Sequence, residues 1–492
     1  MTFKYINSHL IMAFVSLFFI TMSFFFSIDT YYDDNNRWMC VAFVLFYAWL
    51  FRPSICKSDP VIGYFGFFIF LFVTQRVVMA TFYTAHNWEH QLYKPYMVQE
   101  TLFNLSLYIG AFYLVLRLMR NQLRKIIHSV QLAAQRINDI ELKFIVVVAM
   151  YLIYAVLNYI ILYTGGTFGH NNGTNTSFLY RYVLKIISPD FIFYIFMALY
   201  FLSPVIRRKF FKLGIGLMVF FVFMKVIQGS KAGIFELFIV VLMYFSLFNN
   251  RKIIKVNFKF FINTAILVAV SIYIFSVVAY IQFVYWYGAG NQYVAEVSTI
   301  TDPVIRVINS LDRISRRLSI VEDAIKVMNY QQLGFRDISQ YHNLTTAAKL
   351  ALDALIPSTL YPDLLKSQYA LALMINNGPT IRDGVEVYAG YWWGFYGYHH
   401  FLFGLYQGMA VMAMFLVLNV WFIRLVFKFS SNTFKLAFFF TFFPLFFFTY
   451  IGFFGYEHIL SMYVYNMVLW SINFIGYYIL FVMVRGSSRK SL

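Results

Sequence analysis

The chain has 492 residues, of which 61% are hydrophobic, 22% aromatic and only 12% charged. Soluble globular domains carry about a quarter of their residues as Asp, Glu, Lys and Arg. This composition excludes a soluble enzyme, a disordered chain and a conventional nucleic-acid-binding domain, although the formal net charge is +18.

Apolar stretches of membrane-spanning length recur along the chain. A transmembrane helix needs about 20 apolar residues. Twelve candidate spans lie at residues 9–28, 38–51, 61–83, 101–119, 144–166, 186–206, 213–229, 232–248, 262–286, 400–423, 436–454 and 461–484. The second span is short and must borrow flanking residues, and the seventh and eighth are close enough to form a hairpin. The pattern predicts an all-α, polytopic membrane helix bundle of about 12 transmembrane helices.

The distribution of charge predicts the orientation of these spans. With the N-terminus in the cytoplasm, the cytoplasmic segments hold 23 Lys and Arg against three acids, Asp59, Asp139 and Glu141. The rest of the chain holds 16 Lys and Arg against 18 acids. This is the positive-inside bias of membrane proteins. It predicts that both termini are cytoplasmic, and it relates the surplus charge to anionic membrane lipids and not to a nucleic acid.

Three segments follow from this topology. Residues 1–286 hold spans one to nine, residues 287–399 form one long outer segment, and residues 400–492 hold the last three spans and a cytoplasmic C-terminus. The outer segment holds ten acids and nine Lys and Arg, and such long connections are usually functional. We therefore expect a helical cap there that carries the function.

The sequence lacks the signatures of nucleotide and metal chemistry. No G-x-x-x-x-G-K-[ST] loop occurs, and the cytoplasmic loops are too short for a nucleotide-binding domain. The nine histidines include one adjacent pair, His399–His400, which reads as an interfacial pair more readily than as a metal site. We expect no cofactor and no metal.

An arginine stripe marks the start of the outer segment. Residues 301–303, Thr-Asp-Pro, are typical of a helix start. An apolar face follows at helical spacing: Val304, Ile308, Leu311, Leu318, Val321, Ile325 and Met328. Arg306, Arg313 and Arg317 align on another face. They can pair with Asp302, Glu322 and Asp323, contact anionic lipid, or bind a phosphorylated substrate through bidentate hydrogen bonds.

Four ionisable residues lie at membrane depth, where charges usually face a partner or a cavity. They are Arg76, Lys225, Lys231 and Glu236. Interhelical pairing is the alternative to function for Arg76 and Lys225. Lys231 favours function because it lies in a Gly-Ser-Lys-Ala-Gly turn at residues 229–233, where backbone N–H groups at a helix start can approach an anion.

A second constellation precedes the tenth span. Residues 378–388 read GPTIRDGVEVY, and residues 390–397 read GYWWGFYG. Arg382 offers an anion contact and Glu386 a possible general base beside aromatic rings that can stack on sugars. The alternative for the tryptophans is an aromatic belt at the membrane interface.

Together these features resemble the Wzy-type oligosaccharide repeat-unit polymerases that build bacterial O-antigen or capsule. The resemblance rests on the many-span layout with a dominant late outer loop, the turn at 229–233, and Glu386-x-Tyr388 followed by Gly394-x-x-Gly397. The family turn commonly reads Gly-Ser-Arg-Gly, so Lys231 keeps the charge and loses the bidentate fork.

The resemblance implies a metal-independent glycosyltransferase of the bacterial inner membrane, whose long loop is periplasmic. It would polymerise undecaprenyl-diphosphate-linked repeat units, which serve as donor and acceptor, alongside a flippase and a chain-length regulator of the same pathway. The expected base is Glu386, with His342 as alternate. The expected contacts to diphosphate or sugar anions are Lys231, Arg313, Arg317, Arg382 and Arg76.

Three alternatives remain open at this point. O-antigen ligases share the layout, and His342-Asn343 begins their histidine pattern, but Asp353 stands where a glycine is expected. A lipid-linked oligosaccharide flippase or other secondary transporter would have discontinuous helices or inverted repeats, and no repeat is detected. A non-catalytic scaffold would leave Lys231 and Arg382 unexplained.

Overall fold

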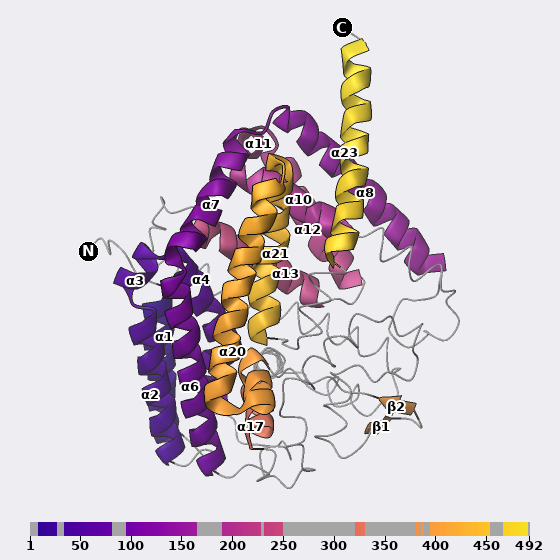
Figure 1. Cartoon of the computed structure of the whole chain (residues 1–492). Coiled ribbons are helices and arrows are strands. Elements are labelled where there is room, and N and C mark those ends of the chain that lie inside the picture. Colours follow the sequence, from indigo (N-terminus) through magenta and orange to yellow (C-terminus); the bar gives the residue numbers. More distant parts are fainter. Residues whose placement is uncertain are drawn as a thin grey trace, which may run out of the picture. The chain divides into compact units, whose positions relative to one another are not determined.

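The computed structural model of the chain describes residues 8–26, 34–80, 95–164, 189–227, 231–248, 320–329, 380–382, 385–387, 394–452 and 466–490 (Figure 1). Packing divides the chain into two compact units. Unit 1 comprises Met1–Lys125, Ile314–Val426 and Leu445–Tyr465, and unit 2 comprises Ile126–Arg313, Phe427–Pro444 and Asn466–Leu492. The three segments predicted from sequence describe membrane topology, which this division does not test.

Six helices in the described ranges are long and apolar enough to cross a membrane: Asn35–Ser58, Pro60–Val78, Tyr96–Leu118, Ile140–Ile160, Tyr396–Phe429 and Met467–Gly486. Three shorter apolar helices are His9–Phe24, Pro189–Leu202 and Leu237–Leu247. These helices indicate a multi-pass membrane protein. The total of about 12 spans stays a prediction, and the predicted span 262–286 lies outside the described residues.

Unit 1 contains the helices formed by the N-terminal part of the sequence, up to α6. They are α1 (Ser8–Phe26), α2 (Asp34–Leu50), α3 (Pro53–Ser58), α4 (Pro60–Ile69), the π-helix η1 (Phe70–Thr74), α5 (Gln75–Ala80) and α6 (Pro95–Leu118). Helices α1, α2 and α6 pack side by side (Figure 1). Proline at the first position starts α3 and α4, where its missing N–H costs no hydrogen bond. Later segments add α17 (Val321–Met328) and most of α20 (Gly394–Phe429).

Unit 2 is built around α8 (Ile140–Thr164) and α10 (Pro189–Leu202), which pack on each other and on α23 (Asn466–Lys490). The remaining helices are α7 (Arg120–Gln135, shared with unit 1), α11 (Pro204–Lys209), α12 (Phe211–Ile227), α13 (Lys231–Leu247) and part of α21 (Asn432–Gly452). Stacked aromatic rings fill the core; the rings of Phe193 and Phe221 lie 3.9 Å apart and nearly parallel. Helices α12 and α13 pack on each other, as the predicted hairpin requires.

The three acids assigned to the cytoplasmic side each pair with a basic residue of another segment. The pairs are Arg120–Asp59 at 3.4 Å, Arg485–Asp139 at 3.1 Å, and Lys209–Glu141. Within unit 2, the last two pairs bring the start of α8 together with the ends of α11 and α23. These helix ends were all assigned to one membrane side by the charge pattern.

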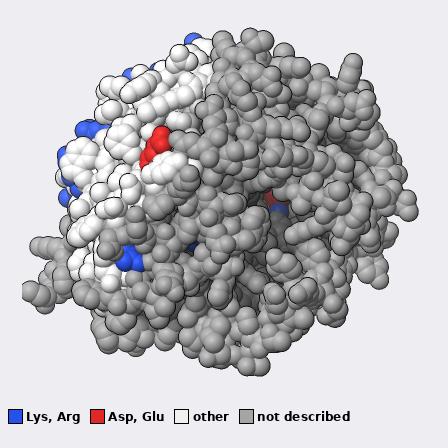
Figure 2. Space-filling model, turned by 90° about the horizontal axis from the view of Figure 1, so that it is seen from below, with Lys and Arg blue, Asp and Glu red and all other residues white. Residues whose placement is uncertain are grey.

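Large apolar side chains cover much of the exposed surface of these helices. Leu118 is 84% exposed, Phe14 72% and Trp421 58%. On the described part of the face drawn in Figure 2, uncharged atoms predominate and charged groups occur at a few separate places. Exposed apolar surface of this extent fits contact with lipid.

A short β-hairpin is the one departure from helical structure in the described residues. Strand β1 (Thr380–Arg382) pairs antiparallel with β2 (Val385–Val387), so that Ile381 faces Glu386 and Arg382 faces Val385. The all-α expectation did not include it. The two residues between the strands are Asp383 and Gly384, a pair typical of two-residue hairpin turns, so the sequence carried the signal.

Candidate functional site

Helix α6 carries a buried polar stripe in the half that the topology assigns to the outer side. Thr101, Asn104 and Tyr108 recur at intervals of three and four residues, so they share one helix face. Thr101 and Tyr108 are fully buried and Asn104 is 6% exposed. This stripe was not predicted, although its spacing is visible in the sequence, because none of its residues is charged.

Helix α17, from the predicted outer segment, packs on this stripe. Asn329, 2% exposed, follows its last residue and donates from Nδ2 to Thr101 Oγ1 and to Ile325 O, both at 2.9 Å. The contact to a carbonyl fixes Nδ2 as the donor side of the amide. Asn329 Oδ1 therefore remains a buried acceptor without a hydrogen-bond partner among the described residues.

The start of α17 is held by span three. The backbone N–H of Ile320 donates to Phe72 O at 3.1 Å, and Phe72 lies in η1. π-Helical turns inside α-helices often mark functional sites. The predicted apolar positions Val321 and Ile325 are 2% and 3% exposed, which confirms this part of the predicted apolar face. This piece of the outer segment is thus part of the core of unit 1.

Helix α20 completes the site and is broken near its N-terminal end. Gly404 has φ 71° and ψ −172°, which interrupts the helix between a short first part and a long second part. Tyr108 Oη donates to the Gly404 carbonyl oxygen at 2.9 Å. A helix break within an apolar span leaves backbone groups that need partners from the protein, since lipid offers none. The ring of Tyr108 also lies 6.1 Å from Tyr396 and 6.3 Å from His400.

We call this set of side chains the polar core: Thr101, Asn104, Tyr108, Asn329, Tyr396, His399 and His400. Hydroxyl, amide and imidazole groups of this kind form hydrogen bonds with sugar hydroxyls. Groups of three or more His, Cys, Asp or Glu that could hold a metal ion do not occur among the described residues.

Two of the membrane-depth cations have described side chains. Arg76, in α5, is 1% exposed and lies four residues after Phe72, which accepts the N–H of the outer segment. Lys225, near the end of α12, pairs with Asp190 at the start of α10 at 2.5 Å. Of the two interpretations of Lys225, a functional role or an ion pair between helices, the structure therefore supports the ion pair. Lys231 is the first residue of α13, as the predicted helix start requires.

The register of the hairpin separates the two residues expected to act together before span ten. Arg382 and Glu386 lie on adjacent rungs of the ladder and are not cross-strand partners.

The remaining predicted site residues are outside the part of the chain that the structure describes. They are Arg313, Arg317 and His342, together with Arg306 of the stripe. Their expected roles stay predictions.

Comparison of the chain with protein-family models, with curated proteins and with solved structures finds no match.

Proposed function

We propose that this chain is a membrane glycosyltransferase that polymerises undecaprenyl-diphosphate-linked oligosaccharide repeat units at the periplasmic face of a bacterial inner membrane. The observation that carries the proposal is the integration of α17 into the bundle. A segment of the predicted outer loop is hydrogen-bonded to η1 and α6, and it brings a buried amide acceptor, Asn329 Oδ1, to the polar core.

The proposed reaction needs a polar site where the periplasmic face of the inner membrane meets the helix bundle. A hydroxyl of the incoming repeat unit attacks the anomeric carbon of the growing glycan, and the bond from that carbon to the diphosphate oxygen breaks. The hydroxyl proton passes to a base, for which we propose Glu386 with His342 as alternate. The diphosphate leaves with its lipid, and its charge requires nearby cations.

For those cations we propose Lys231, Arg313, Arg317, Arg382 and Arg76. The placement of Lys231 at the first position of α13 supports its role, since a helix N-terminus and a cation both favour phosphate. Arg76 lies 1% exposed in the segment that follows η1, and its contact with the diphosphate is part of the proposal. The polar core contributes hydroxyl, amide and imidazole groups, whose chemistry suits sugar hydroxyls, and Asn329 Oδ1 lacks a hydrogen-bond partner among the described residues.

Surface polysaccharide from cells that lack the chain, complemented with variants, tests the proposal on a gel. Loss of a polymerase collapses the ladder to a core-plus-one-unit band. We expect that complementation with Arg382→Ala, Arg313→Ala or Glu386→Gln does not restore the ladder. Lys212→Ala, at an exposed lysine of α12, should restore the ladder at equal membrane abundance. Restoration by Glu386→Gln would remove this residue from the mechanism.

One observation favours a second candidate, a lipid-linked oligosaccharide flippase or other secondary transporter. Such proteins use discontinuous helices at their substrate sites, and α20 is discontinuous at Gly404. The same gel separates the two functions, because loss of a flippase removes even the single unit from the surface lipid. The ligase alternative rests on His342, which lies outside the described residues.

A further inference from the structure

A basic cluster surrounds the turn between α3 and α4 in unit 1. The two segments that meet there, residues 51–59 and 117–125, hold six Lys and Arg and one acid, Asp59. The side chain of Asp59 is only 1% exposed. One carboxylate can offset one guanidinium, so the cluster keeps a surplus of positive charge.

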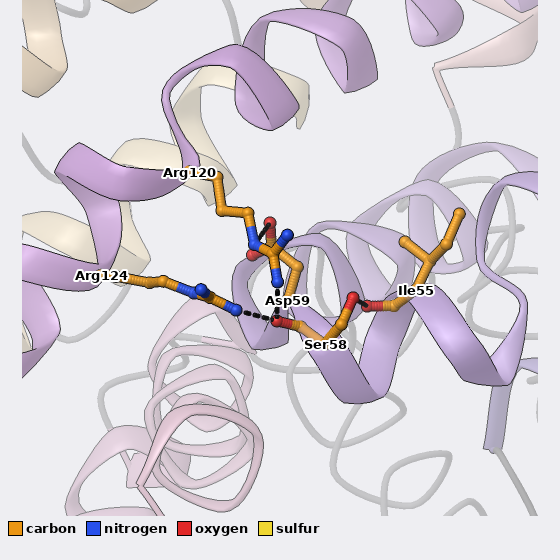
Figure 3. Close-up of polar contacts among 5 residues, drawn as sticks. All are labelled: Ile55, Ser58, Asp59, Arg120 and Arg124. Atoms are coloured by element: carbon orange, nitrogen blue, oxygen red, sulfur yellow. Dashed lines mark hydrogen bonds and ion pairs between the residues drawn. The ribbon is translucent and has the colours of Figure 1, made fainter.

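Two arginines of this cluster are held by the same acceptor (Figure 3). Arg120 and Arg124 lie one turn apart on α7, and both donate from Nη2 to the Ser58 carbonyl oxygen, at 2.8 Å for Arg120. Arg120 Nε also lies 3.4 Å from Asp59 Oδ2. Each guanidinium has five donor hydrogens, so these contacts fix its position and leave donors for another acceptor.

The arginines remain accessible while Asp59 does not. The Arg120 side chain is 29% exposed and Arg124 is exposed, so an anion can reach both. Burial raises the pKa of the Asp59 carboxyl, and the nearby guanidiniums of Arg120, Arg124 and Arg117 oppose that shift. Because Asp59 is buried beside Arg120, its carboxyl group positions the guanidinium from the protein interior and leaves the solvent-facing side of the guanidinium uncovered.

Exposed apolar side chains begin directly beside the cluster. Leu118 is 84% exposed and Leu114 59% exposed on the last turns of α6. On the neighbouring helix α2, Trp49 is 59% exposed, and the Arg52 guanidinium lies over its ring at 5.5 Å. Tryptophan and arginine in this arrangement are typical of the level of lipid headgroups.

We propose that Arg120 and Arg124, with Arg117, bind the phosphate of an anionic phospholipid whose acyl chains lie along the exposed surface of α6 and α2. Charge complementarity selects the anionic headgroup, and the apolar residues below it select a lipid over a soluble anion. This site does not depend on the proposed polymerase activity.

Native mass spectrometry of the full chain in detergent tests the site. Phosphatidylglycerol should bind in preference to phosphatidylcholine. Arg120→Ala and Arg124→Ala should each weaken binding of phosphatidylglycerol about tenfold, as expected for loss of a hydrogen bond between charged groups. The affinity of Arg124→Lys for phosphatidylglycerol should lie between those of the alanine variants and wild type, since lysine keeps the charge and loses the bidentate guanidinium geometry.

Lys212→Ala removes one exposed positive charge from α12 and should bind as wild type does. Unchanged melting temperatures for Arg124→Ala and Arg124→Lys would show that lost binding is not lost folding. Equal binding of the two lipids, or wild-type affinity in both arginine-to-alanine variants, would overturn the proposal. Competition by inorganic phosphate at the same concentration as the lipid would overturn the assignment to a lipid.

Discussion

Gly408 packs closely against the polar core. A methyl group added there would lie 2.7 Å from the carbonyl oxygen of His399 and would overlap the hydroxyl of Tyr108. The hydroxyl would have to leave the Gly404 carbonyl oxygen, to which it donates a hydrogen bond. Gly408→Ala thus combines overpacking with the loss of a buried hydrogen bond.

The magnitude follows from these two effects. Overpacking costs about 1–3 kcal/mol, and a buried carbonyl without its donor costs about 1–3 kcal/mol. Alanine recovers up to about 1 kcal/mol in a helix. We expect a net destabilisation of roughly 3 kcal/mol, seen as a fall of several degrees in melting temperature, followed by tryptophan fluorescence in detergent.

The matched control is Gly397→Ala on the same helix. A methyl group at Gly397 would meet Ala324 and Val327 at 3.8 Å, which is ordinary van der Waals contact. This variant should melt within about a degree of wild type or slightly above it. Adding Tyr108→Phe to Gly408→Ala should rescue part of the loss, because it removes one of the overlapping atoms. Equal melting temperatures for Gly408→Ala and Gly397→Ala would refute the packing of the polar core described above.

Three further predictions concern other parts of the two units. Gly214→Ala should destabilise unit 2 by about 1–3 kcal/mol because the methyl group would overlap the ring of Tyr200. Gly216→Ala, two residues further along α12, should be neutral or stabilising by up to about 1 kcal/mol, since nothing lies within 4 Å of its methyl group; a reversed order of melting temperatures would contradict both. The raised pKa of Asp59 makes the folded state hold this proton more tightly than the unfolded state, so stability falls as pH rises through that pKa. The melting temperature of Asp59→Asn minus that of wild type should therefore be larger at neutral pH than at acidic pH. A difference that does not depend on pH would contradict the burial of this carboxyl. Asn329→Ala should lose about 1–3 kcal/mol of docking free energy for α17, measured as faster proteolysis of the outer segment; unchanged proteolysis would contradict the docking.

Much of the helical layout could be predicted because membrane-spanning length and apolarity are local properties of the sequence. The helices α6, α8 and α20 overlap predicted spans, and the apolar spacing of Val321 and Ile325 predicted the buried face of α17. The break at Gly404 could not be predicted in this way. It depends on a hydrogen bond from Tyr108, which lies 296 residues earlier in the chain, and the run around Gly404 reads as an uninterrupted span.

The site was predicted less well than the spans because its described members are mostly uncharged, and uncharged polar residues are inconspicuous in an apolar sequence. Charges at membrane depth are conspicuous in a sequence, yet Lys225 proved to have Asp190 as an interhelical partner. The groups that the described structure brings together, such as Thr101 and Asn329, are uncharged and distant in sequence. Their association arises from the return of the outer segment to α6, which no local pattern specifies.

The contact between α17 and α20 offers a test that separates a polymerase from a transporter. A Cβ atom at Gly397 would lie 3.8 Å from Cβ of Val327, which is the mean separation in disulfides. Val327→Cys with Gly397→Cys should therefore form a crosslink, detected by a mobility shift after cleavage of the chain between the two positions. A transporter that moves its broken helix against the rest of the bundle would lose activity when crosslinked and regain it on reduction. A polymerase whose outer segment stays docked would keep its ladder in both states. Failure of the crosslink to form, with each single cysteine variant folded, would show that α17 does not dock on α20 and would contradict the polar core as a site.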